Sequence, residues 1–230
     1  MGSIAENLAA VKKRLEAAAH RVGREPEDVR LVAVSKSVPV ELLKEAVAAG
    51  QRIFGENYLQ EARPKIAALG AGLSWHFVGH LQTKKAKAVV ELFDLIHSVD
   101  RLKLAQALEQ AAAALNKVQD ILLQVNLAGE ETKSGASPGE VAGLLEEISK
   151  LQHLRVLGLM TMPPWFPDPE QVRPYFRALR ELRDRLQDLR LVDNPLSELS
   201  MGMSHDFETA VEEGATLVRV GTAIFGKRGS

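Results

Sequence analysis

The chain has 230 residues, 46% of them hydrophobic and 26% charged, and 29 basic against 30 acidic side chains leave a formal net charge of -1. This composition suits one globular domain with a sizeable core, or two small ones, and the balanced charge provides no field of one sign to recruit nucleic acid or an anionic membrane. The absence of cysteine excludes disulfides, thiolate catalysis and cysteine-ligated metals.

The first predicted element is a helix, which begins at the capping-box pattern of Ser3 and Glu6. Its apolar residues recur at helical spacing and form one stripe: Ile4, Leu8, Val11, Leu15 and Val22. After Gly23 and Pro26 the pattern changes, and short apolar runs alternate with amphipathic stretches.

The short apolar runs predict strands, because they are rich in β-branched residues and bounded by turn residues. Eight runs qualify: Val29–Ser35, Arg52–Gly55, His76–Gly79, Leu95–Val99, Asp120–Val125, Val156–Thr161, Leu196–Met201 and Leu217–Val220. Stretches typical of helices lie between nearly all of them, and two begin with a capping residue followed by proline: Ser137-Pro138-Gly139-Glu140 and Asp168-Pro169-Glu170-Gln171. From Arg173 to Arg190, arginines are interleaved with acidic residues, which is typical of the solvated face of a helix.

Strands that alternate with helices indicate parallel strands joined by crossovers. Eight such units in about 200 residues suit a (β/α)8 TIM barrel. The main alternative is a doubly wound sheet, which usually has a glycine-rich first turn. The first turn here is Ser35-Lys36-Ser37, without glycine. We therefore favour a single barrel domain over residues 1–230, with an extra N-terminal helix.

In such a barrel the active site lies at the carboxyl ends of the strands. Polar residues stand at or just after these ends: Lys36, Glu56, Asn57, His80, Asp100, Asn126, Ser200, Ser204, Arg219 and Thr222. The turns after the last two strands combine small residues with helix starts, as in Ser200-Met201-Gly202-Met203-Ser204 and Gly221-Thr222. Such turns can bind phosphate through N–H groups and hydroxyls, although the same residues also serve as plain turns and caps.

Lys36 follows the buried run Leu31-Val32-Ala33-Val34. An amine at the end of a buried strand is partly desolvated, and desolvation disfavours the ammonium form. A neutral amine is a nucleophile, and its commonest use is a Schiff base with a carbonyl compound. Taken alone, a lysine past a strand end is more often an ordinary surface residue. The prediction therefore depends on the phosphate-binding turns at the same end of the barrel.

A lysine, a phosphate site and a carbonyl ligand suggest either pyridoxal 5'-phosphate (PLP) or a phosphorylated sugar in a Schiff-base aldolase. Arg219 favours PLP, because an arginine cannot give up its proton and keeps a facing pyridine nitrogen unprotonated. The cofactor is then a weak electron sink, which suits binding or restricted proton transfer. An aldolase needs a nearby acid–base carboxylate or a second lysine, and Glu56 and Asp100 are the candidate carboxylates.

At these residues the sequence resembles the pyridoxal phosphate homeostasis proteins (the YggS/PROSC family), whose fold resembles the N-terminal barrel of alanine racemase, PLP fold type III. The matching segments run in order over nearly the whole chain. They are LVAVSKSVP (31–39), FGENYLQEA (54–62), WHFVGHLQTKK (75–85), HSVD (97–100), LLQVNLAGEETKSG (122–135), GLMTM (158–162), LSMGMSHDFETAV (199–211) and RVGTAIFG (219–226).

The resemblance implies that Lys36 carries PLP as a Schiff base and that Arg219 faces the pyridine nitrogen. It also implies that the phosphate of PLP is held by Ser200, Ser204, Gly221 and Thr222. The implied neighbours of the pyridine ring are Asn57, His80 and Met160. The implied function is intracellular vitamin B6 homeostasis, in which the protein buffers or delivers PLP without an established reaction. PLP-dependent apo-enzymes are the expected recipients.

An alanine racemase-type enzyme with weak or narrow activity on amino acids is the alternative. Alanine racemases carry a further β-domain that supplies a tyrosine base and builds the dimer site. Here only Ile224 to Ser230 follow the start of the last turn, and the sole tyrosines, Tyr58 and Tyr175, are not expected to replace that base. We therefore expect a monomeric carrier without catalytic residues.

Two other signals carry weaker predictions. His76 and His80 have the spacing of a helical zinc pair, but on a strand four residues span about 13 Å, so no metal site is expected. Lys133 lies in the loop Glu130-Glu131-Thr132-Lys133-Ser134-Gly135, where a solvated lysine is the ordinary interpretation. The alternative is a second amine that accepts the aldehyde and helps to load or release the cofactor.

The expected location follows from what the sequence lacks. No apolar run approaches the roughly 18 residues needed to span a bilayer. The N-terminal stretch is amphipathic and contains acidic residues, unlike a signal peptide. We expect a cytoplasmic protein that binds neither nucleic acid nor membranes.

Overall fold

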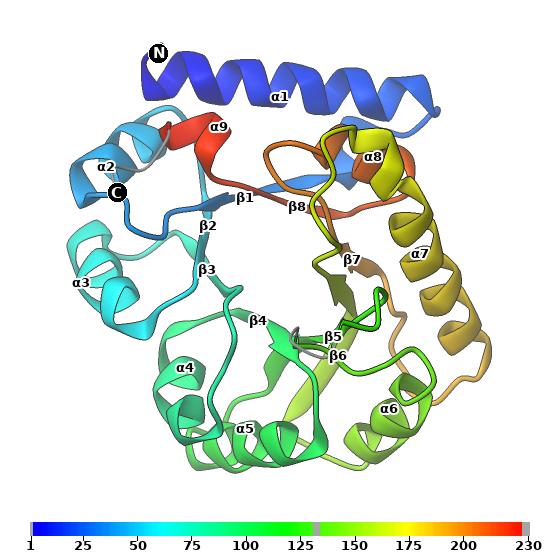
Figure 1. The fold of residues 1–230 in the computed structure, drawn as a ribbon. Coiled ribbons are helices and arrows are strands. Elements are labelled where there is room, and N and C mark those ends of the chain that lie inside the picture. Colours follow the sequence, from blue (N-terminus) through cyan, green and yellow to red (C-terminus); the bar gives the residue numbers. More distant parts are fainter. Residues whose placement is uncertain (1, 131–133, 227–230) are drawn as a thin grey trace.

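A closed barrel of parallel strands forms the centre of the molecule (Figure 1). The computed structural model describes residues 2–130 and 134–226. Each strand pairs in parallel with the next in sequence, and β8 (Leu217–Val220) pairs back to β1 (Arg30–Val34). This closure confirms the predicted (β/α)8 barrel, because an open doubly wound sheet would leave its two edge strands unpaired.

The predicted strands are all present, with small differences at their ends. The remaining strands are β2 (Ile53–Glu56), β3 (Ser74–Phe77), β4 (Leu95–Val99), β5 (Gln119–Val125), β6 (Leu154–Thr161) and β7 (Glu198–Ser200). The largest difference is at β3, which was predicted as His76–Gly79. The apolar run there continues past Phe77, but the chain turns at Gly79, where any Cβ would lie 2.5 Å from the carbonyl oxygen of Asn57.

Helices surround the barrel and cover its outer face (Figure 1). They are α1 (Ile4–Arg21), α2 (Val40–Ala48), α3 (Leu59–Leu69), α4 (Ala86–Leu92), α5 (Leu102–Ala114), α6 (Val141–Ser149), α7 (Arg173–Asp188), α8 (Phe207–Glu212) and α9 (Thr222–Phe225). The arginine-rich stretch forms α7, as predicted, and three of its arginines pair with Glu213. Among the described residues, none of the helices combines the length and apolarity that a membrane crossing requires.

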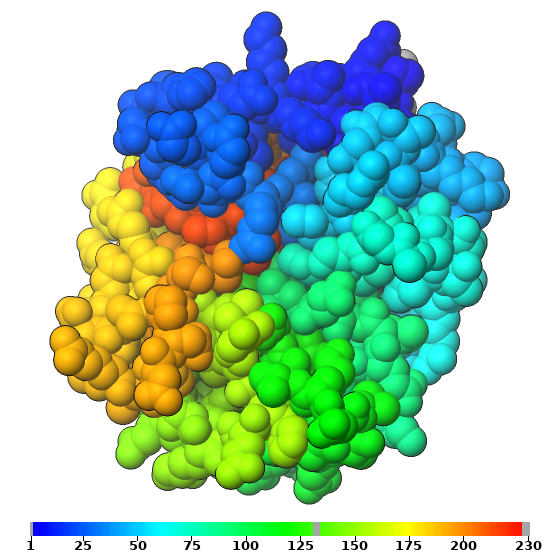
Figure 2. Space-filling view, turned by 180° about the vertical axis from the view of Figure 1, so that it is seen from behind, coloured from blue at the N-terminus to red at the C-terminus, as the bar shows by residue number. Residues whose placement is uncertain are grey.

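The extra N-terminal helix α1 lies across the short helix α9 and beside α8 (Figure 1). Its capping box of Ser3 and Glu6 forms as predicted. Asn7 donates a hydrogen bond of 2.8 Å to the carbonyl of Ile224, and Arg14 pairs with Glu208 at 2.7 Å. Figure 2 shows from behind how the N-terminal segment, in blue, packs against the C-terminal segment, in red. Helix α1 therefore covers the part of the barrel where the last crossover helix is only four residues long.

The inside of the barrel contains a small apolar cluster, whose buried residues all come from strands. It is separate from the main core, which lies between the strands and the helices. Its buried members are Val32, Leu95, Leu122, Met160 and Leu217. Because side chains alternate along a strand, the residues two positions further on β4 and β8, His97 and Arg219, also point inward. The lumen therefore combines an apolar layer with buried polar groups.

Candidate functional site

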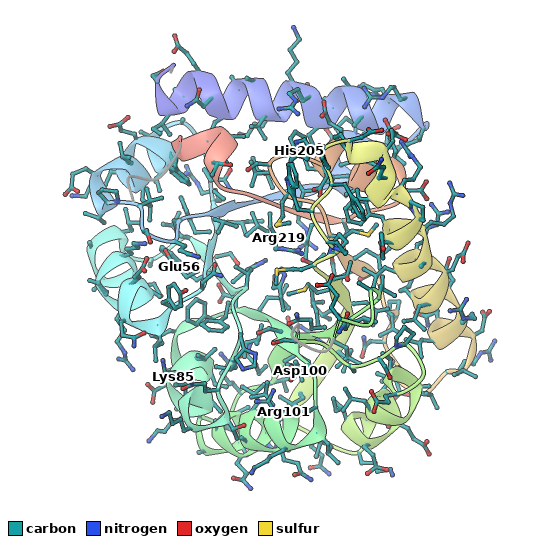
Figure 3. All side chains as sticks on the ribbon, in the orientation of Figure 1. Glu56, Lys85, Asp100, Arg101, His205 and Arg219 are labelled. Atoms are coloured by element: carbon teal, nitrogen blue, oxygen red, sulfur yellow. The ribbon has the colours of Figure 1, made fainter. Side chains whose placement is uncertain are left out.

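A cavity of ≈ 350 Å³ lies at the carboxyl ends of the strands, where the barrel fold was expected to place a site. Six of the predicted site residues line it together: Lys36, Asn57, Ser204, Arg219, Gly221 and Thr222. Its other lining residues are Val34, Val78, Met162, Trp165, Met203, His205 and Asp206. Figure 3 shows Arg219 near the middle of the barrel, with His205 beyond it toward α1. A cation and a primary amine thus line the same cavity.

Three predicted residues lie outside this cavity. His80 is exposed and lines an adjoining hollow of ≈ 430 Å³, where its Nδ1 lies 2.9 Å from the hydroxyl of Ser134. Met160 is fully buried in the apolar cluster of the lumen. Ser200 is also fully buried, and its hydroxyl contacts Arg219 and His97. The Ser200 side chain therefore does not reach the cavity, where a phosphate group would have to lie.

The backbone on both sides of Lys36 is held by helix α3. The carbonyl of Ser35 accepts a hydrogen bond of 2.7 Å from Nζ of Lys65, and the N–H of Ser37 donates one of 2.5 Å to Glu61. Ser37 adopts a left-handed conformation with φ of 58°. Backbone strain of this kind persists only where the surroundings fix it, and it is common at functional sites. The turn that presents Lys36 is thus fixed on both sides.

Glu56 lies behind this turn, between the barrel and α3, and is completely buried (Figure 3). Its Oε1 accepts hydrogen bonds from Ser35 Oγ at 2.6 Å and from Lys65 Nζ at 2.7 Å. Burial raises the pKa of the Glu56 carboxyl, while the hydrogen bonds from Lys65 and Ser35 oppose that rise. Glu56 therefore does not line the cavity, and neither does Asp100, which pairs with Arg101. The acid–base carboxylates considered for an aldolase are not at the site.

Arg219 enters the cavity from β8 and is only 4% exposed. Its guanidinium donates to the hydroxyl of Ser200 and, at 2.8 Å, to the carbonyl of Thr161. Burial lowers the pKa of Arg219 to about 10, and the nearby Asp206 opposes that effect. Burial in turn raises the pKa of Asp206, whose Oδ1 accepts a 2.6 Å hydrogen bond from the N–H of Met203. Arg219 remains a cation at neutral pH and faces the cavity.

The turns after β7 and β8 meet at Ser204. Its hydroxyl oxygen accepts hydrogen bonds from the main-chain N–H groups of Gly221 at 3.2 Å and Ala223 at 3.3 Å. Gly202 makes this arrangement possible, because its φ is +90° and a Cβ there would lie 2.5 Å from the Cβ of Ala210. Two amides and a hydroxyl thus converge at one edge of the cavity, as phosphate recognition requires.

Aromatic residues border the mouth of the cavity. Trp165 is 67% exposed and stacks on His205, with 5.6 Å between ring centres. The ring of Tyr58, which was not expected to contribute to the site, lies 5.5 Å from Nζ of Lys36. Tyr175 instead stacks on Phe166.

Several residues around the candidate site were not predicted from the sequence, and the two weaker signals lead to no site among the described residues. His76 contacts His97 rather than His80, and the described residues contain no group of three metal-binding side chains. Lys133 lies outside the described residues. Asp206, His97 and Lys65 were not predicted; the first two lie within segments that matched the family, SHDFE and HSVD, which was the available signal.

Comparisons with known proteins show the family and the fold of the chain. The sequence model of the family described as "Alanine racemase, N-terminal domain" matches residues 7–229. The pyridoxal phosphate homeostasis protein of Aquifex aeolicus (strain VF5) is 49% identical over 224 residues, covering 97% of each chain. That of Escherichia coli (strain K12) is 43% identical over 232 residues, covering 99% of this chain and 98% of the relative.

Solved structures show the same family and the same fold. PipY of Synechococcus elongatus PCC7942, determined with PLP bound, is 40% identical with a TM-score of 0.86, covering 97% of this chain and all of PipY. Alanine racemase of Corynebacterium glutamicum, at 19% identity and a TM-score of 0.75, shares the fold over 98% of this chain and 61% of its own. The chain therefore belongs to the pyridoxal phosphate homeostasis proteins, within the alanine racemase N-terminal domain family.

Proposed function

We propose that this protein binds PLP in the cavity at the carboxyl end of the barrel and acts in intracellular PLP homeostasis. The observation that carries the proposal is the convergence of three different groups on one cavity: the amine of Lys36, the buried cation of Arg219 and the amides around Ser204. The names of the relatives and the PLP-bound structure of PipY support it.

Each part of the cofactor has a matching group in the cavity. The amine of Lys36 would condense with the aldehyde to a Schiff base and release one water molecule. Arg219 would donate to the pyridine nitrogen and keep it unprotonated. The phosphate would replace the Ser204 hydroxyl oxygen as acceptor for the N–H groups of Gly221 and Ala223, and the hydroxyls of Ser204 and Thr222 would donate to it. PLP supplies an electron sink when bound, and Arg219 keeps that sink weak.

The remaining predicted residues have less direct roles in this proposal. Asn57 forms the wall beside the ring, where Gly79 packs against its backbone. His80 lies in the adjoining hollow, at the side of the mouth. Ser200 and Met160 lie deeper in the barrel and would act on the cofactor only through their neighbours.

We further propose that the protein buffers or delivers PLP rather than turning over a substrate, that it works as a monomer in the cytoplasm, and that PLP-dependent apo-enzymes receive the cofactor. The relatives are named for homeostasis and not for a reaction. A racemase-type activity is the second candidate, because the Tyr58 ring lies beside the Lys36 amine. The two candidates differ in whether an amino acid is racemised.

The test is the visible absorbance of the purified protein after addition of PLP. A Schiff-base band is expected in the wild type and in Lys44→Ala, an exposed lysine of α2, but not in Lys36→Ala. Absence of the band from the wild type contradicts the proposal. Interconversion of D- and L-alanine at an enzyme-like rate, lost in Tyr58→Phe, would favour the racemase instead.

A further inference from the structure

A chain of hydrogen bonds runs through the barrel lumen and joins Arg219 to His76. Arg219 Nη1 lies 2.5 Å from Ser200 Oγ, which lies 2.8 Å from His97 Nδ1. His97 Nε2 lies 3.0 Å from His76 Nδ1. Four strands contribute one residue each, and none of the four residues is more than 4% exposed. Solvent therefore does not compete for these three contacts, and each donor in them needs its acceptor within the protein.

The chemistry of arginine fixes the direction of this chain. A guanidinium has only donors, so the oxygen of Ser200 must accept from Arg219. Among the described residues, His97 is the one other partner of this hydroxyl, so the hydrogen of Ser200 has an acceptor only if it points to Nδ1 of His97 and that nitrogen is unprotonated. His97 consequently carries its proton on Nε2 and donates it to Nδ1 of His76. His76 in turn carries its proton on Nε2. The three hydrogen bonds of the chain all donate away from Arg219, and both histidines are neutral.

The charges around the chain favour the same state. Burial lowers the pKa of His76 to about 3, and the positive charge of Arg30 adds to the effect. Burial also lowers the pKa of His97 well below its ordinary value, with further contributions from His76, Arg219 and Arg30. Asp206 is the acidic neighbour of Arg219, and Arg30 is itself paired with Glu198. A proton on either histidine would thus add a second buried cation beside Arg219.

We propose that Ser200, His97 and His76 are positioning residues that orient Arg219 toward the cofactor. The guanidinium has five N–H groups, and its two hydrogen bonds to Ser200 and Thr161 fix its plane while leaving N–H groups for the cavity that it lines. This inference rests on the proposed function, in which Arg219 faces the pyridine nitrogen of PLP. Ser200 acts on the cofactor through Arg219 and not through the phosphate.

The direction of the chain can be tested without the cofactor. In the PLP-free wild type at neutral pH, the side-chain ¹⁵N resonances of His76 and His97 are expected to show two neutral rings, both protonated on Nε2. A proton on Nδ1 of either ring, or a charged ring, overturns the proposal. This measurement does not depend on PLP binding. A wrong direction of the hydrogen-bond chain can therefore be distinguished from a wrong proposed function.

The positioning role is tested by PLP binding. Ser200→Ala and His97→Leu break the chain and are expected to weaken PLP binding about ten- to a hundredfold, as for a lost hydrogen bond to a charged group. His97→Gln keeps one acceptor and one donor and should restore most of the affinity. Ser98→Ala is the matched control, because it removes a neighbouring buried hydroxyl that has no hydrogen-bond partner.

The absorption spectrum of bound PLP adds a measurement that does not depend on the overall stability of the protein. The Schiff-base absorption maximum should shift in Ser200→Ala and His97→Leu, and should return toward the wild-type position in His97→Gln. If Ser200→Ala and Ser98→Ala bind PLP as tightly as the wild type and give its spectrum, the positioning role is wrong. If the wild type binds no PLP, the proposed function fails, whatever the histidine resonances show.

Discussion

Replacing Lys65 by methionine gives the sharpest test of how Lys36 is held in place. The Lys65 amine is almost completely buried and donates to Glu56 Oε1 and to the Ser35 carbonyl, each at 2.7 Å. The second carboxylate oxygen of Glu56 is also buried, and no described residue forms a hydrogen bond with it. Lys65→Met therefore leaves a buried carboxylate without its cation, which typically costs about 3–5 kcal/mol.

The sign of the pH dependence follows from the same geometry. Burial already raises the Glu56 pKa, and removing the Lys65 cation removes a group that opposes this rise. Between the unfolded and folded pKa values, the native state of the variant holds a proton that the unfolded state has lost. Its stability therefore falls as the pH rises through this window. The cost of Lys65→Met should be largest at neutral pH and smaller near pH 4.5, where the unfolded carboxyl also begins to take up its proton.

The assay is urea unfolding at pH 7 and near pH 4.5, with Lys44→Met on the exposed face of α2 as the control. The double variant Glu56→Leu/Lys65→Met should recover most of the lost stability, because an apolar pair can replace a buried ion pair with little net cost. A Lys65→Met cost below about 1 kcal/mol at pH 7 would refute the reasoning, since that is the range of an exposed pair. Schiff-base formation at Lys36 should also slow, because the Ser35 carbonyl loses its donor.

Three other outcomes follow from local geometry. Gly202→Ala should lower the free energy of unfolding by about 1–3 kcal/mol in a thermal melt, because it adds overpacking to a left-handed backbone, whereas Gly143→Ala, in open space, should not destabilise. Ser3→Ala removes the N-cap of α1 and should cost about 1 kcal/mol by the same measurement. Trp165→Ala breaks the stack on His205 and should speed PLP transfer to an apo-enzyme about tenfold, without changing the melting temperature. A tenfold change corresponds to a release barrier that is lower by roughly 1.4 kcal/mol. Equal transfer rates would show that the stack does not retain the cofactor.

The parts of the site that follow from strand order could be predicted from the sequence. Lys36 and Arg219 meet because parallel strands place all their carboxyl ends at one end of the barrel. Which face each side chain takes was harder to predict. On β2 the alternation sends Gly55 toward the lumen and Glu56 outward to α3, so a carboxylate at the rim is not in the cavity. Because Gly55 is the residue of that pair that faces the lumen, the sequence could have indicated that its neighbour Glu56 faces the helices.

Pairs between distant strands could not be predicted. His97 and Ser200 are 103 residues apart, and no local pattern links them. A short run such as HSVD shows where polar residues lie along one strand. Only closure of the barrel decides which residue of another strand each of them contacts. For the same reason the contact of the Ser200 hydroxyl with Arg219 could not be predicted, and a role of Ser200 in phosphate binding stays a prediction.

The contact of α1 with α8 and α9 has a consequence for the order of events during synthesis. Helix α1 is synthesised well before two of the helices that it packs against, and Ile224 lies 217 residues after Asn7. Until those late residues appear, α1 can make only its contacts with nearby elements such as α2, and contacts between such distant segments form slowly. A nascent chain of this protein would thus expose part of the apolar stripe of α1 until α8 and α9 have been synthesised.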